Sequence, residues 1–308
     1  MAGGPRTVTV IGCVQADVIV SPVTDLPPAG GTSLLEHTSI RVGGAGANAA
    51  LALAEAGMTV RLMGCLGDDQ LGEWMREDLA PHGLGDELTI LAGEPSGLTI
   101  ALQSPQRDRT FLTYLGVNRI WQADMLPDDA LDTGNLLLCD YFVAPGFQGA
   151  AARRLLETCR ARGGRTFFDT AWDPEGFAPA TRAEVLELLP TVDVFLPNEA
   201  EACALAGGEP DAVGWAARTL QRISGGWVVV KRGAQGCLAV GPDGAELDAA
   251  APAVKVADTT GAGDAFNAGL IAALSRGAPW PAAVRAAVDF ASAVVARPSH
   301  ERHRRRAA

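Results

Sequence analysis

The chain of 308 residues has room for one large domain or two of ordinary size, and its 48% hydrophobic and 20% charged residues favour a packed core over disorder. A formal net charge of −11 argues against nucleic acid or an anionic membrane as the main partner, but it leaves a local phosphate site open. No stretch approaches the roughly 20 apolar residues of a membrane span, and residues 1–12 lack the pattern of a signal peptide.

The N-terminal part predicts two strands, a loop and an edge strand. The apolar run 7–11 predicts a buried first strand, and residues 14–20 continue with Asp17 as a single carboxylate among apolar neighbours. Asp17 is either a surface acid at a strand end or a hydroxyl-binding group at the carboxyl edge of a sheet, where open α/β proteins place ligands. Residues 21–31, rich in Pro and Gly, predict a loop, and residues 32–42 predict an edge strand.

A glycine-rich loop follows at residues 43–48, with the sequence GGAGAN, in front of a predicted helix of small residues at 49–56. Its glycines permit close contact between the backbone and a ligand, and Asn48 offers both a donor and an acceptor to a sugar hydroxyl. The loop also fits a loose dinucleotide-binding fingerprint, although no acidic residue ends the strand predicted at 59–64.

The middle of the chain predicts a hairpin and then a parallel sheet. Residues 97–103 and 109–116 alternate around a polar turn and predict a β-hairpin, which could form a small sheet with the two earlier strands. Farther on, strands alternate with helices, as expected of right-handed βαβ units. The predicted strands are 135–138, 165–168 and 192–196, and the predicted helices are 149–162 and 181–189.

Polar residues follow several of these strands. Asp169 and Asp173 either line a pocket or are acids of the loop. Asn198 and Glu201 have the spacing of a capping box at the start of a helix, which is compatible with a second role at the helix mouth. Residues 231–236, KRGAQG, predict an ordinary hairpin turn between strands 227–230 and 237–240, and Lys231 and Arg232 add local positive charge to it.

The most informative stretch is residues 258–264, DTTGAGD, which leads into a small-residue helix predicted from Ala265 to about Leu274. The first amides of a helix have no internal partner and attract anions, and a helix N-terminus would hold Asp264 ionised. A carboxylate beside such an anion site can accept the proton of an alcohol while the amides and a metal ion neutralise a moving phosphoryl group. The alternative is a glycine-rich turn with Asp264 as the N-cap. A further helix is predicted at 280–297.

Residues 258–269, DTTGAGDAFNAG, resemble the C-terminal signature of the ribokinase-like (PfkB) carbohydrate kinases, and residues 43–48 resemble the N-terminal signature. The two lie about 215 residues apart in the expected order, and the resemblance runs from about Val8 to about Ala296. It implies a single α/β domain over residues 1–308, with a central, mostly parallel sheet flanked by helices. It also implies a small β-sheet lid formed by about 13–42 and 97–117, while 298–308 reads as a frayed basic tail.

The resemblance implies transfer of the γ-phosphoryl group of ATP to a primary hydroxyl of a sugar, sugar acid or nucleoside. Asp264 would be the base, and the amides of Gly261, Ala262 and Gly263 would form the anion hole. The acceptor would be bound by Asp17 and by Gly43, Gly44 and Asn48 of the N-terminal signature.

The resemblance also implies the positions of the cofactors. Mg²⁺ would be held through water by Asn198 and Glu201, and K⁺ could be bound by Asp258 and Thr260. The nucleotide would lie against Asn198, Lys231, Gly233, Gly236 and Ala291.

Two departures from the family pattern bear on the substrate. Ribokinases usually carry Asn where this chain has Gln15, and often Lys where it has Ala45; residues 139–142 make the pocket more apolar. Two rival functions are a catalytically silent sugar- or nucleotide-binding regulator on the same scaffold and an NAD-dependent oxidoreductase, which would need a fingerprint at the first strand.

The remaining expectations concern compartment and partners. Six scattered cysteines without a C-x-x-C pair predict buried thiols and a reducing cytoplasm. Four histidines leave little for a His-based zinc site or a Ser-His-Asp triad. The expected partner is a small-molecule acceptor rather than nucleic acid or membrane, and a homodimer through the lid is a candidate assembly.

Overall fold

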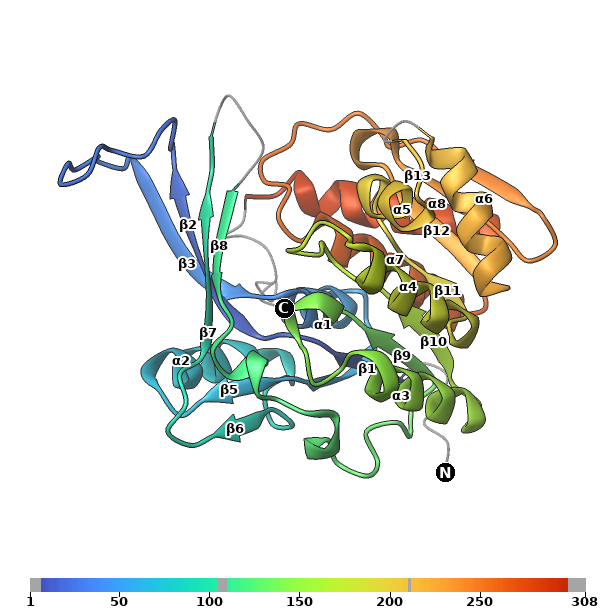
Figure 1. The fold of residues 1–308 in the computed structure, drawn as a ribbon, viewed down its shortest axis with the longest axis horizontal. Coiled ribbons are helices and arrows are strands. Elements are labelled where there is room, and N and C mark those ends of the chain that lie inside the picture. The colour runs from blue at the N-terminus through green and yellow to red at the C-terminus, as the bar shows by residue number, and fades with distance from the viewer. Residues whose placement is uncertain (1–6, 105–109, 210–211, 299–308) are drawn as a thin grey trace.

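A computed structural model describes residues 7–104, 110–209 and 212–298 of the chain. Its centre is an eight-stranded sheet in the order β14-β13-β12-β11-β10-β9-β1-β4 (Figure 1). Neighbouring strands from β4 to β12 pair in parallel, and the pairs β12–β13 and β13–β14 are antiparallel, so the predicted, mostly parallel sheet is confirmed. The strands are β1 (Thr7–Ile11), β4 (Thr59–Met63), β9 (Asn135–Leu138), β10 (Arg165–Phe168), β11 (Val194–Phe195), β12 (Trp227–Lys231), β13 (Cys237–Val240) and β14 (Glu246–Ala249).

Helices cover both faces of this sheet (Figure 1). One face carries α1 (Ala45–Glu55), α7 (Ala262–Ser275) and α8 (Trp280–Val295), and the other carries α3 (Gly149–Ala161), α4 (Pro179–Leu188), α5 (Glu199–Ala206) and α6 (Val213–Ser224). A further helix, α2 (Gln70–Leu79), accompanies the two short strands β5 (Cys65–Gly67) and β6 (Thr89–Leu91).

Alternating side chains of each central strand fill two separate cores. In β10, Phe167 packs into the core under α1, α7 and α8, whereas Phe168 packs into the core under α3 to α6. In β1, Val10 and Ile11 divide in the same way. Successive side chains of a strand point to opposite faces, so a sheet covered on both sides needs the continuous apolar runs seen in the sequence.

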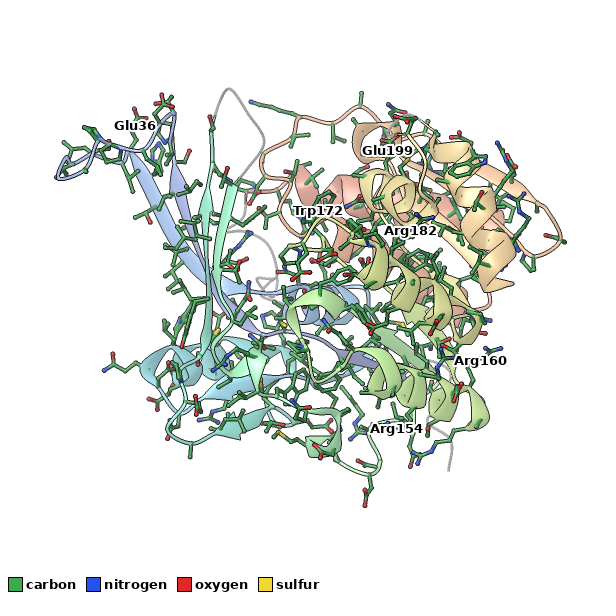
Figure 2. The ribbon with its side chains drawn as sticks, viewed as in Figure 1. Glu36, Arg154, Arg160, Trp172, Arg182 and Glu199 are labelled. Carbon is green, nitrogen blue, oxygen red and sulfur yellow. The ribbon has the colours of Figure 1, made fainter. Side chains whose placement is uncertain are left out.

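A second, four-stranded sheet projects from the first, in the order β3-β2-β7-β8 (Figure 1). Its strands are β2 (Gln15–Ser21), β3 (His37–Gly43), β7 (Gly97–Leu102) and β8 (Thr110–Tyr114). The antiparallel pairing of β7 with β8 confirms the predicted hairpin. Figure 2 shows Glu36, just before β3, at the outer end of this sheet.

Several predicted boundaries were wrong. The helix predicted at 49 begins at Ala45, and the helix predicted at 265 begins at Ala262, because both glycine-rich motifs enter helical conformation. The edge strand predicted at 32–42 begins only at His37. Beyond Pro298, the predicted tail lies outside the described residues. None of the described helices combines the length and apolar character needed to cross a bilayer.

Candidate active site

The strand order creates a switch point at the carboxyl ends of β1 and β9. After β1 the chain forms β4, which pairs with one edge of β1, and later β9, which pairs with the other edge of β1. Ligands of open α/β sheets bind outside the carboxyl ends of the strands at such a point. The residues that follow or end β9, β10, β11 and β12 at this edge are Asp140, Asp169, Asn198 and Lys231.

The two glycine-rich signatures meet at this edge. The Asn48 side chain, in the first part of α1, hydrogen-bonds the Asp264 carboxylate near the start of α7. Gly261 precedes α7 with φ of +72°, a conformation that favours glycine, and a side chain built there would lie 3.7 Å from Asn48 Cγ. The dinucleotide interpretation of the 43–48 loop is wrong, because the preceding β3 is an antiparallel strand of the four-stranded sheet.

Asp264 is the third residue of α7, so the alternative that it is the N-cap is wrong: the N-cap is Gly261. The helix N-terminus was expected to hold this carboxyl ionised, but its pKa is shifted in the opposite direction. The enclosed position of the carboxyl, followed by the charges of Asp169 and Asp140, raises its pKa well above the usual value, although Lys231 and the bond from Asn48 act in the opposite direction.

Lys231 lies at the centre of the charged groups. Its Nζ is 2.5 Å from Asp169 Oδ2, which also accepts a hydrogen bond of 2.6 Å from Asn267 Nδ2 on α7. A side chain built at Gly263 would lie 3.5 Å from the same Nζ, so the lysine lies beside the start of α7. Burial alone would lower the lysine pKa, but the carboxylates of Asp169 and Glu201 raise it, which keeps the ammonium charged.

The predicted capping box at the start of α5 is present. Asn198 Oδ1 accepts from the Glu201 amide at 2.9 Å, and Glu201 Oε2 accepts from the Asn198 amide at 2.8 Å. A backbone bridge joins Asn198 to Lys231, which brings this helix mouth beside the lysine. Burial, and then the charge of Asp169, raises the pKa of Glu201 to about 7.

Asp140 is a buried residue of the site that the sequence analysis did not name as functional. It adopts the left-handed conformation at φ of 59°, and its Oδ2 accepts hydrogen bonds from the amides of Cys13 at 2.9 Å and Gly46 at 3.0 Å. The carboxylate thus ties the end of β1 to the start of α1. Burial raises its pKa to about 6, against these amide hydrogen bonds. The available signal was an acid just after a buried strand.

Asp17 is buried inside β2 of the four-stranded sheet, so both positions considered for it, a surface strand end and the carboxyl edge of the parallel sheet, are wrong. A side chain on Gly43 would collide with its carboxylate, which explains why glycine stands there. Gln15 Nε2 donates to Asp17 Oδ1 at 3.3 Å and to Thr99 Oγ1 at 2.6 Å. Burial raises the pKa of Asp17, although Arg41 and Gln15 oppose the rise. Gly44 is the N-cap of α1.

Other predicted residues lie farther from this cluster or are already engaged. Gly233 and Gly236 lie in the turn between β12 and β13, and Ala291 packs against the core from α8. The amide of Ala262 donates to the Thr259 carbonyl at 3.2 Å. Asp173 accepts from amides of its own loop, as the loop interpretation expects.

A cavity of about 580 Å³ lies at the opposite edge of the sheet, where the central strands begin. It is lined by residues such as Asn135, Arg165 and Trp227, and it includes none of the predicted site residues.

The charges fit a bound divalent cation. Asp169, Glu201 and Asp264 lie close enough to Lys231 to raise its pKa, and Asp140 lies close to Asp169 and Asp264, so four acids share one lysine and a cation would offset their charge. The described residues contain no group of three or more His, Cys, Asp or Glu side chains arranged to hold a metal by themselves. Mg²⁺ does not need one, because it keeps several waters and binds through one or two carboxylates and substrate phosphates.

The predicted K⁺ ligand Asp258 is already engaged. Its Oδ1 accepts from the amide and hydroxyl of Thr260, each at 2.8 Å, and its Oδ2 lies 3.3 Å from Arg41 Nη1. The guanidinium therefore already offsets the charge of this carboxylate.

Comparison with known proteins shows relatives of this chain in sequence and in fold. A fructokinase of Vibrio alginolyticus is 30% identical over 280 residues, covering 86% of each chain. An aminoimidazole riboside kinase of Salmonella typhimurium is 31% identical over 261 residues, covering 79% of this chain and 77% of the relative. The structure of Arabidopsis thaliana ribokinase complexed with ribose and ATP has a TM-score of 0.80 at 24% identity, covering 96% of this chain and 93% of that one. Residues 6–302 match the family described as pfkB family carbohydrate kinase. The chain belongs to this family.

Proposed function

We propose that the protein transfers the γ-phosphoryl group of ATP to a primary hydroxyl of a sugar, sugar acid or nucleoside. The observation that carries the proposal is the meeting of Asn48 with Asp264 at the switch point of the sheet. An amide that can bind an acceptor hydroxyl thereby stands next to a carboxylate that can accept its proton. The fructokinase and riboside kinase relatives support the substrate class.

Asp264 is the proposed base. Its raised pKa makes it a stronger base than an ordinary Asp, which brings it closer to the alcohol it must deprotonate. Proton transfer still comes late, and most of the acceleration comes from positioning and electrostatics. The amides of Gly261 and Gly263 and the ammonium of Lys231 stabilise the charge of the moving phosphoryl group. Because the Ala262 amide already has a carbonyl partner, its contribution is the smaller one.

The acceptor lies between the four-stranded sheet and the start of α1. Asp17 and Asn48 bind its hydroxyls, while Gly43 and Gly44 let the backbone approach. The four-stranded sheet acts as the lid of one ribokinase-like domain, and its closure keeps water from taking the phosphoryl group. Gln15 holds the Asp17 carboxylate in place for this contact.

The nucleotide lies along the carboxyl edge, over the turn that contains Gly233 and Gly236, with Ala291 near the base. Asn198 and Glu201 hold Mg²⁺ through water, and the cation neutralises phosphate oxygens and offsets the surplus of carboxylates. Because Glu201 already bonds Asn198 with both of its oxygens, contact through water fits better than direct ligation. The buried free cysteines support a reducing, cytoplasmic setting.

A homodimer through the lid is part of the proposal. All five residues of the edge strand β8 are exposed, and Phe111, Leu112 and Tyr114 on it are each more than half exposed. Apolar side chains on an exposed edge strand are suited to packing against a second copy of the chain. We expect light scattering to give twice the chain mass of 31.9 kDa for the wild type and a single mass for Phe111→Lys. A monomeric wild type at micromolar concentration would contradict the dimer.

The function is tested by ADP release over a panel of sugars, sugar acids and nucleosides in the presence of Mg²⁺. We expect at least one acceptor to raise ATP turnover at least ~10²-fold above the rate without acceptor, as expected of an oriented acceptor. If none raises turnover while ATP still binds, the silent regulator replaces the kinase.

A further inference from the structure

One contact joins the four-stranded sheet to the segment that leads into α7. Arg41 Nη1 on β3 lies 3.3 Å from Oδ2 of Asp258, a residue 217 positions later. Arg41 is also directly opposite Asp17 in the β2–β3 register. We infer that Arg41 is a positioning residue, which couples the sheet that holds the acceptor to the loop that presents Asp264. This inference rests on the proposed kinase function.

Asp258 connects the ion pair with Arg41 to the segment that precedes α7. Its second oxygen, Oδ1, accepts from both the amide and the hydroxyl of Thr260, at 2.8 Å each. Thr260 directly precedes Gly261, the N-cap of α7. A chain of direct contacts therefore runs from Arg41 through one carboxylate to the glycine whose conformation sets the start of the helix.

The ion pair is enclosed, which makes it different from an ordinary surface pair. The Arg41 side chain is 20% exposed and that of Asp258 is 7% exposed. Arg41 Nε and Nη2 are buried and have no hydrogen-bond partner among the described residues, so Asp258 is the carboxylate that fixes the guanidinium. Removing one member of an enclosed pair leaves a poorly compensated charge, whereas exposed pairs contribute little.

The arrangement explains how acceptor binding could set the catalytic loop. An acceptor that binds Asp17 fixes the four-stranded sheet over the site. Because Arg41 lies on this sheet, its ion pair with Asp258 is then held in place as well. Coupling of this kind is reciprocal, so loosening the loop must also loosen the sheet. Arg41 touches no reacting atom in this scheme, so its loss should lower kcat through the position of Asp264 and leave ATP binding intact.

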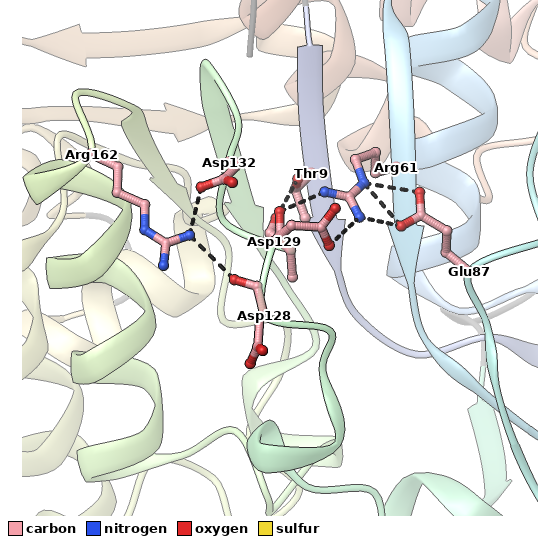
Figure 3. Close-up of polar contacts among 8 residues, drawn as sticks. Thr9, Arg61, Glu87, Asp128, Asp129, Asp132 and Arg162 are labelled. Atoms are coloured by element: carbon pink, nitrogen blue, oxygen red, sulfur yellow. Dashed lines mark hydrogen bonds and ion pairs between the residues drawn. The ribbon is translucent and has the colours of Figure 1, made fainter. Parts of the chain in front are cut away.

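The test compares Arg41→Gln, Arg41→Lys, Asp258→Asn and the double variant Arg41→Gln/Asp258→Asn with a matched control, Arg61→Gln. Arg61 lies on the edge strand β4, far along the chain from α7, and its side chain is 18% exposed. It pairs with Glu87 and Asp129 (Figure 3). The control thus removes an arginine of similar exposure that is likewise paired with carboxylates, but outside the proposed path.

Hydrogen–deuterium exchange of the ligand-free proteins is the first measurement. Arg41→Gln should speed exchange of the Thr260 amide at least about tenfold, and Asp258→Asn should speed exchange in β3, while Arg61→Gln changes neither. Unchanged exchange at Thr260 in Arg41→Gln overturns the inference. Because no turnover is needed, this result is independent of whether the wild type is a kinase.

Turnover with the best acceptor is the second measurement. Arg41→Gln should lower kcat about tenfold with the KM for ATP changed less than about twofold, and Arg41→Lys should recover part of the loss. The double variant should be no slower than the slower single variant, because both changes break one contact. Losses that multiply, or a kcat equal to that of Arg61→Gln, overturn the inference. Absence of acceptor-dependent turnover in the wild type overturns the proposed function alone.

Discussion

Asp264→Asn is expected to lower kcat by at least ~10²-fold while leaving ATP binding nearly intact, because loss of a general base is worth about 10²–10⁴. The amide keeps the size of the side chain and can still bond to Asn48, so positioning is largely preserved. Acceptor-dependent ADP release gives kcat, and calorimetry gives the affinity for ATP. An unchanged kcat would remove Asp264 from the mechanism.

The thermal stability of Asp264→Asn gives a second test of the role of Asp264. Because the pKa of Asp264 is raised in the folded protein, protonation of the carboxyl is favoured by folding; stability from this group is present at low pH and is lost as pH rises through the folded pKa. The variant cannot ionise at this position, so it should melt at a higher temperature than the wild type above that pKa. A rise in Tm together with a loss of kcat separates a catalytic role from damage to the fold.

The pH dependence of kcat should reflect the same raised pKa of Asp264. Wild-type kcat should fall on acidification at a higher pH than an ordinary Asp would give, because the base must be ionised to act. The residual activity of Asp264→Asn should lack this step.

Much of the site could be predicted because its motifs are local. The spacing of Asn198 and Glu201 gave the capping box, which depends only on two residues and one helix start. The glycine-rich segments could be recognised from the chain alone, although their glycines suggested loops where the structure has the first turns of α1 and α7. Glycine tolerates both conformations, so sequence cannot decide which one packing will select.

The charge balance could not be predicted, because it depends on contacts between distant residues. Asp169 meets Lys231 across 62 residues, and Asp140 meets the amide of Gly46 across 94. The expectation that Asp264 is held ionised rested on the helix N-terminus alone, whereas burial, followed by the charges of Asp169 and Asp140, raises the pKa of its carboxyl. Strand order decides which acids share an edge, and strand order is not a local property.

Lys231→Met is expected to lower the free energy of unfolding by about 3–5 kcal/mol, the usual effect of leaving a buried carboxylate without its partner. The Lys231 side chain is 12% exposed and that of Asp169 is 8% exposed. The lysine also faces the charges of Glu201 and Asp264, so its loss leaves several carboxylates without a nearby cation. Urea unfolding measures the change.

The same geometry predicts an asymmetry between the partners. Asp169→Asn should destabilise less than Lys231→Met, because the ammonium keeps Glu201 and Asp264 as neighbouring charges and the new amide oxygen can still accept from Asn267. Adding Asp169→Asn to Lys231→Met should recover part of the loss. Arg218→Met, which breaks an exposed pair with Glu246 of 3.0 Å, is the control and should change stability by at most about 1 kcal/mol. Equal losses in Lys231→Met and Arg218→Met would mean that solvent screens the cluster, and the charge surplus proposed to attract Mg²⁺ would then lose its physical basis.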